Sequence, residues 1–241
     1  MMFFILVLGY NILFYLGEYC SANAENHLLS AAFLLVFLTI VIQFIRRTGA
    51  LTCSFDRKSE KDLPFTAWII PGLFGLWSIV QTVKSLYYGA EVYPIDTVIG
   101  TLLLVTASAV YEELLFRGFI FEYLLPHGYS CALWGADILF AAAHMFNSQF
   151  GSFCYDFVIQ ILIALCFGYF FSVFVFMTKS LFPAICMHIW INAVSPYNYL
   201  QEAPRFDEYD LLVYVVLAVI CLCYSNRIYR QQKEGMVRII R

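Results

Sequence analysis

Titratable side chains occur at three places inside long apolar stretches of this sequence. The first place holds two adjacent glutamates, Glu112 and Glu113, and the other two hold His144 and His188. Carboxylates and imidazoles are the side chains that act as general bases in enzymes, and both also bind zinc. Because such groups are costly inside a bilayer, their presence in apolar stretches is by itself a functional-site hypothesis.

An arginine follows the glutamates at helical spacing. Arg117 lies four residues after Glu113 in the favourable order, so we predict that it neutralises Glu113. Glu112 is rotated by about 100° from Glu113 on a helix, and its own i+4 neighbour is Phe116. Its carboxylate is therefore left for a water molecule, a histidine or a metal ion. In the alternative interpretation, both glutamates bind Arg117 and have a structural role.

Each histidine shares its apolar stretch with a second polar residue. Asp137 lies seven residues before His144 and either lines the same cavity or snorkels to the surface; we favour snorkelling. Asn192 lies one turn after His188, on the same helical face. A lone histidine in a helix is more often a hydrogen-bonded core residue than a catalytic one. Three polar groups at intermediate depth nevertheless favour one shared site.

The composition around these groups is typical of a membrane protein. Of the 241 residues, 62% are hydrophobic and 13% are charged, whereas soluble domains average roughly half apolar and a quarter charged residues. Too few charged side chains remain to cover a soluble exterior, so we predict that lipids surround the protein. The net charge of −3 gives no basic surface for nucleic acid.

The apolar runs predict an all-α fold, a polytopic membrane protein with about eight transmembrane helices in one bundle around an intramembrane polar site. These runs lie near residues 2–16, 28–45, 64–83, 95–124, 131–146, 156–177, 180–195 and 209–225. No linker divides the chain. We therefore predict a single membrane domain over residues 1–241, with residues 95–195 as its catalytic core.

The distribution of basic residues predicts the orientation. With the N-terminus inside, the cytoplasmic segments hold eleven Lys and Arg residues, and the outer loops hold only Lys84 and Arg205. Both termini are therefore predicted to be cytoplasmic, at the plasma membrane if the protein is bacterial. Cleavage of the first run as a signal peptide is disfavoured, because no basic segment precedes it. Cys20 and Cys154 fall in predicted outer loops, where a disulfide is an open possibility.

Together these patterns resemble the CAAX protease and bacteriocin-processing family of intramembrane endopeptidases, related to the type II CAAX prenyl endopeptidase. The three family motifs, EExxxR, FxxxH and HxxxN, occur in family order as Glu112-Glu113-x-x-x-Arg117, Phe140-x-x-x-His144 and His188-x-x-x-Asn192. The resemblance covers about residues 95–195. Asp137 stands where a small polar residue is expected, which leaves its role open.

The resemblance implies hydrolysis of a peptide bond within the membrane. Glu112 would be the general base for a water molecule held jointly with His144. His188 and Asn192 would donate hydrogen bonds to the oxyanion of the tetrahedral intermediate. The site would be entered from the cytoplasmic side.

The remaining motif residues and the question of a metal also follow from the resemblance. Glu113 and Arg117 would fix the helix and the local charge behind the catalytic residues. Glu112, His144 and His188 are a suitable zinc set with water in the fourth position, but an HExxH motif is absent. A metal-free mechanism fits these residues equally well, and we slightly prefer it.

The implied substrate is a lipidated or hydrophobic peptide at the membrane. Eukaryotic relatives process prenylated CAAX proteins, whereas bacterial relatives are associated with peptide maturation. The alternative function is non-proteolytic: a membrane binding or immunity protein, or a small proton-coupled transporter that uses the same polar cluster. Transport is disfavoured because the sequence shows no duplicated halves.

Overall fold

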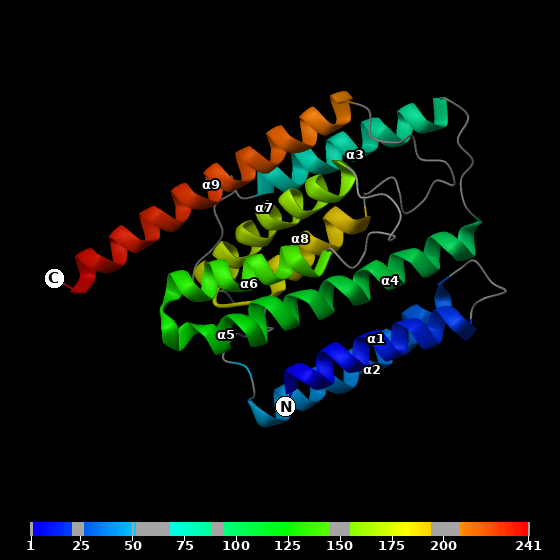
Figure 1. Ribbon diagram of the computed structural model, residues 1–241, viewed down its shortest axis with the longest axis horizontal. Coiled ribbons are helices and arrows are strands. Elements are labelled where there is room, and N and C mark those ends of the chain that lie inside the picture. The colour runs from blue at the N-terminus through cyan, green and yellow to red at the C-terminus, as the bar shows by residue number, and fades with distance from the viewer. Residues whose placement is uncertain are drawn as a thin grey trace. The chain divides into compact units, whose positions relative to one another are not determined.

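Helices make up nearly all of the computed structural model, which describes residues 2–20, 27–49, 51, 68–87, 94–144, 155–193 and 208–240. This confirms the predicted all-α class for the described residues. The helices, labelled as in Figure 1, are α1 (Met2–Cys20), α2 (Leu28–Thr48), α3 (Ile69–Tyr87), α4 (Ile95–Glu113), α5 (Phe121–Leu124), α6 (Tyr129–Ala143), α7 (Tyr155–Thr178), α8 (Phe182–Ala193) and α9 (Glu208–Ile240).

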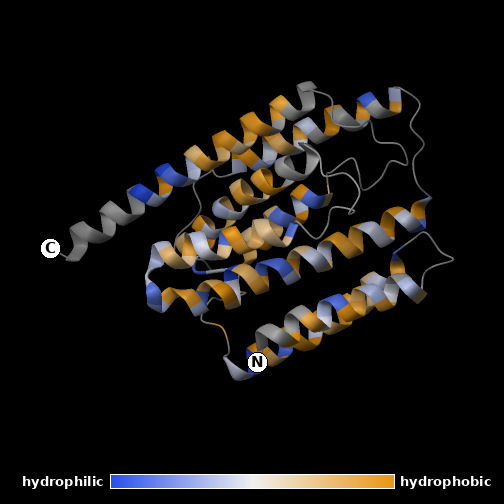
Figure 2. Cartoon of the chain, in the orientation of Figure 1, coloured by the Kyte–Doolittle hydropathy of each residue, from blue (hydrophilic) through white to orange (hydrophobic). Residues whose placement is uncertain are grey.

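Several helices are apolar along most of their length (Figure 2). Within the described residues, three stretches are long and apolar enough to cross a membrane: Leu28–Thr48, Ile95–His127 and Ile161–Thr178. Helices α6 and α8 are also apolar, but their 15 and 12 residues span only about 22 and 18 Å against a hydrocarbon core of about 30 Å. The helices therefore indicate an integral membrane protein, and the count of eight spans stays a prediction.

Some expectations fall on parts of the chain outside the described residues. The possible disulfide requires Cys154, and the disfavoured signal-peptide cleavage concerns residues 22–24; neither segment is among the described residues. The cytoplasmic location of the two termini also stays a prediction.

The chain forms two compact units, each built from segments that are distant in sequence. The first unit contains Met1–Thr52, Pro71–Leu115 and Ile185–Arg205, and the second contains Cys53–Ile70, Phe116–Ala184 and Phe206–Arg241. In the first unit α2 packs against α1 and α4. In the second unit α7 packs against α6 and α9, and α5 packs against α6. The single bundle over residues 1–241 stays a prediction.

Helix α2 forms the centre of the helix packing in the first unit. Its buried apolar residues repeat every three or four positions, as expected for a helix that packs along one stripe: Ala31, Leu34, Leu38, Val41 and Ile45. Where α1 packs against α2, a side chain on Gly17 of α1 would collide with the backbone of Ser30 in α2. Glycine at this position therefore allows α1 and α2 to approach closely.

The helix that carries the two glutamates changes its geometry directly after them. Helix α4 ends at Glu113, and the chain continues as a π-helix over Leu114–Ile120 before α5 begins. A π-helix closes i→i+5 hydrogen bonds and occurs mostly as short segments, frequently at functional sites. Each of its residues therefore advances less around the helix axis than a residue of an α-helix does.

Candidate active site

The first unit brings together both glutamates and one of the histidines. The His188 ring on α8 lies between two carboxylates of α4: its Nδ1 is 2.8 Å from Glu113 Oε1, and its Nε2 is 3.6 Å from Glu112 Oε2. The side chain of Glu113 is fully buried, and those of His188 and Glu112 are 6% and 19% exposed. Three titratable groups thus meet in a region that is largely screened from solvent.

The short contact determines which ring nitrogen of His188 carries the proton. An ionised carboxylate can only accept hydrogen bonds, so Nδ1–H donates to Glu113 at 2.8 Å. Carboxylates in this position fix the orientation and tautomer of a functional histidine. In the neutral ring, Nε2 therefore carries a lone pair toward Glu112. Glu112 Oε2 is buried and has no hydrogen-bond partner among the described residues.

Helix α1 contacts α4 within one turn of Glu112. The ring of Tyr111, the residue before Glu112, stacks on Tyr10 of α1 with ring centroids 3.9 Å apart. The hydroxyl groups of Tyr10 and Ser108 are 2.7 Å apart and form a hydrogen bond. Because Ser108 lies four residues before Glu112, both contacts restrain the segment of α4 that presents the carboxylate.

The second unit holds a buried polar cluster around Arg117, which the π-helix carries. Arg117 Nε donates to Ser172 Oγ on α7 at 3.3 Å, and Ser172 donates to Asp137 Oδ1 on α6 at 2.6 Å. Arg117 Nη2 is 3.7 Å from Asp137 Oδ1, and both side chains are fully buried. The guanidinium carbon is 4.1 Å from the ring centroid of Phe140 and 5.5 Å from that of Phe171. The cluster connects the π-helix, α6 and α7.

This cluster corrects one expectation. The prediction that Asp137 snorkels to the surface is wrong, because its carboxylate is buried and bound to Ser172 and Arg117. A buried guanidinium needs a counter-charge, and Asp137 supplies it. The predicted pairing of Arg117 with Glu113 stays a prediction.

His144 lies in the second unit, directly after α6. Its Nδ1 is 2.9 Å from the carbonyl oxygen of Phe140, and because a carbonyl can only accept, Nδ1 carries the proton. Nε2 of the neutral ring is then the acceptor, as in His188. That His144 and Glu112 bind the same water molecule stays a prediction. Asn192 lies one turn after His188 on α8 and is partly buried.

The possible zinc ligands are Glu112, His144 and His188. Glu112 Oε2 and His188 Nε2 are suitable ligands, and both histidines have the tautomer common in zinc ligands, with the second nitrogen bonded to a carboxylate or carbonyl. Catalytic zinc, however, takes three protein ligands. In the part of the chain that the structure describes, no group of three His, Cys, Asp or Glu side chains is placed to hold a metal ion. The implied zinc set takes Glu112 and His188 from the first unit and His144 from the second, so zinc binding stays a prediction, and we derive no step through a metal.

Two side chains of these clusters, Ser172 and Tyr10, were not identified from the motifs. Ser172 lies in the apolar run of α7, where only its polarity distinguishes it from its neighbours. Tyr10 lies in α1, about 100 residues before Glu112. Neither residue has a helical spacing to a motif, so no pattern along the chain could have linked them to the site.

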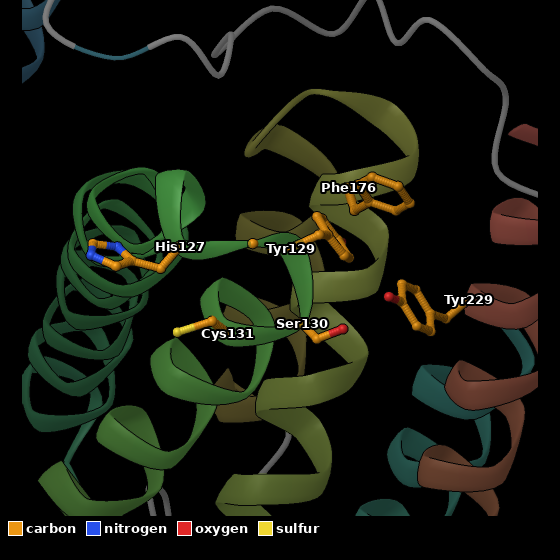
Figure 3. A pocket seen from close by; sticks show the side chains of 7 residues that line it. His127, Tyr129, Ser130, Cys131, Phe176 and Tyr229 are labelled. Carbon is orange, nitrogen blue, oxygen red and sulfur yellow. The ribbon is translucent and has the colours of Figure 1, made fainter. Parts of the chain in front are cut away.

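A pocket of about 450 Å³ lies in the second unit, beside the turn into α6. Its aromatic residues Tyr129, Phe176 and Tyr229 pack on one another. In Figure 3 the side chains of Ser130 and Tyr229 point toward each other. None of the lining residues belongs to the three motifs, so this pocket adds no group to the candidate site.

By its fold and its candidate site, this protein is a helical membrane protein with a buried cluster of carboxylates and an imidazole. Residues 94–194 match the family model described as "Type II CAAX prenyl endopeptidase Rce1-like". This match confirms the resemblance to the CAAX protease family, and at the family level it indicates an intramembrane protease of membrane-associated peptides or lipidated proteins. We found no significant match among curated proteins or among solved structures.

Proposed function

We propose that this protein hydrolyses a peptide bond in a lipidated or hydrophobic peptide held in the membrane, with Glu112 as the general base. One observation carries the proposal: the Oε2 atom of Glu112 is buried without a hydrogen-bond partner and faces His188 Nε2 at 3.6 Å. That separation is too long for a direct hydrogen bond. In the proposed mechanism a water molecule held between Glu112 and His188 serves as the nucleophile.

The proposed reaction follows from these positions. Glu112 takes a proton from the water as the water oxygen bonds to the carbonyl carbon of the substrate. Asn192 donates to the resulting oxyanion, and His144 helps to hold the water. The tetrahedral intermediate collapses as the C–N bond breaks, and the leaving amine receives the proton that Glu112 had taken. Glu113 keeps the His188 ring in place through the hydrogen bond to Nδ1.

The test compares Glu112→Gln with the wild type on a farnesylated peptide that ends in a CAAX sequence, on the unprenylated peptide and on a hydrophobic peptide. The amide keeps the size of the side chain but cannot accept the proton. We expect Glu112→Gln to lower kcat by about 10² to 10⁴, the usual contribution of a general base, while peptide binding persists. Glu122→Gln in α5 is the matched control and should retain wild-type activity.

The same assay separates the alternatives. Full cleavage by Glu112→Gln would show that Glu112 is not the base and would refute the proposal. Peptide binding without cleavage by the wild-type protein on all three peptides would favour the non-proteolytic binding function. The ratio of kcat/KM for the farnesylated and unprenylated peptides identifies the substrate class.

A further inference from the structure

Trp190 of α8 is anchored on α3 by two contacts. Its Nε1–H donates to the carbonyl oxygen of Pro71 at 3.2 Å. One turn further along α3, a Cβ atom on Gly75 would lie 2.9 Å from Cζ2 and 3.0 Å from Nε1 of the indole. These separations are shorter than the normal contact of about 3.5–4.0 Å between carbon atoms. The missing side chain of Gly75 therefore leaves the space that the indole of Trp190 fills.

Trp190 and His188 lie on opposite sides of α8. Two residues correspond to a rotation of about 200° around an α-helix, and the contacts agree with this value. His188 contacts Glu112 and Glu113 of α4, whereas Trp190 contacts α3. Helix α8 is thus held from two sides within the first unit, by α4 through the histidine and by α3 through the tryptophan.

We propose that Trp190 is a positioning residue for His188, and that α3, which lies outside the family-matched residues 94–194, is needed to align the site. The proposal rests on the proposed proteolytic function. A helix moves as a stiff rod over two residues, so a shift of the indole changes the distance between His188 Nε2 and Glu112. Misplacement of catalytic groups by about 1 Å can cost on the order of 10² in rate.

The test adds one methyl group to each of two glycines on α3. Gly75→Ala inserts a Cβ against the indole, whereas a Cβ on Gly72 meets nothing within 4 Å. Both substitutions have the same helix propensity effect, so Gly72→Ala is the matched control. We expect Gly75→Ala to lower kcat by roughly tenfold, with KM within about twofold of the wild-type value. Gly72→Ala should keep the wild-type kcat.

A double-mutant cycle tests whether the effect passes through Trp190. Trp190→Phe removes Nε1 and Cζ2, the atoms nearest to Gly75, and should lower kcat by roughly threefold to tenfold because the hydrogen bond to Pro71 is lost. Without these atoms the added methyl group meets no indole. The double variant should therefore match Trp190→Phe alone rather than show the product of the two losses.

Two further readouts separate positioning from a general loss of folding. The pH profile of kcat should shift in Gly75→Ala and not in Gly72→Ala, because only the first changes the spacing of His188 and Glu112. The kcat values are normalised to folded protein, measured by thermal melting in detergent. If Gly75→Ala does not fold, Trp190→Phe decides: a lower kcat per folded molecule supports the proposal, and an unchanged kcat overturns it.

The outcomes also separate this proposal from the proposed function. A wild-type protein without peptidase activity would overturn both. An active wild type in which Gly75→Ala equals Gly72→Ala would overturn only the positioning role of Trp190. Losses that multiply in the double variant would overturn it as well, because the two positions would then act independently.

Discussion

Replacement of Glu113 by glutamine should slow the reaction without weakening substrate binding. The fully buried Glu113 carboxylate accepts the Nδ1–H of His188 at 2.8 Å. A hydrogen bond to a charged group contributes about 1.5–3 kcal/mol, and one between neutral groups about 0.5–1.5 kcal/mol. The difference of about 1–1.5 kcal/mol corresponds to roughly 5- to 12-fold in rate at about 1.4 kcal/mol per tenfold. We therefore expect kcat of Glu113→Gln to fall by about 5- to 12-fold.

The assay measures kcat and KM on the best cleaved of the three peptides, with Glu122→Gln as the charge-matched control. Glutamine has the size of glutamate, and its amide oxygen can still accept from Nδ1, so the substitution mainly removes charge. KM should remain near the wild-type value because Glu113 is buried behind the ring and is not expected to contact substrate. Glu113→Asp keeps the charge but shortens the side chain, and it tests the importance of the 2.8 Å contact.

The order of the losses tests the assignment of the two glutamates. We expect Glu112→Gln to be the more damaging substitution, because it removes the base itself. A greater loss in Glu113→Gln than in Glu112→Gln would mean that Glu113 is the base and that the roles are exchanged. Wild-type activity in Glu113→Gln would show that the ring of His188 needs no carboxylate to hold it, which would refute this reasoning.

Two other predictions concern the buried arginine and the metal. Asp137→Asn should lower the melting temperature markedly, since loss of one partner of a buried ion pair costs about 3–5 kcal/mol; an unchanged melting curve would show that Arg117 does not depend on Asp137. Peptidase activity should survive dialysis against a chelator, because the proposed mechanism activates the water molecule with Glu112 and uses no metal ion. Loss of activity with recovery at one equivalent of zinc would instead establish a metalloenzyme.

The helical class and the proximity of Glu112 and His188 could be predicted because they depend on patterns along the chain. Apolar runs of bilayer length predict helices, and the described residues are helical where those runs lie. The coincidence of Glu112 and His188 in apolar segments predicted that they share a site, and they face each other at 3.6 Å. For the two site residues the cost of burying a polar group in an apolar segment supplied the signal.

The partners of Glu113, Arg117 and Asp137 could not be predicted in the same way. The partners observed in the structure come from distant segments: Glu113 bonds His188, 75 residues later, and Asp137 bonds Ser172, 35 residues later. Long-range pairing depends on how helices pack, and a single sequence contains no direct measure of that.

The proton positions of the histidines limit the roles that each residue can take. Nδ1 of His188 donates to Glu113, and Nδ1 of His144 donates to the carbonyl of Phe140. In their neutral forms both rings therefore present a lone pair at Nε2, which can accept from water but cannot donate to an oxyanion. His188 can donate to the oxyanion only as an imidazolium. The amide of Asn192 carries its hydrogens in every protonation state, so in the proposed mechanism Asn192 would be the donor of the HxxxN motif whenever His188 is neutral.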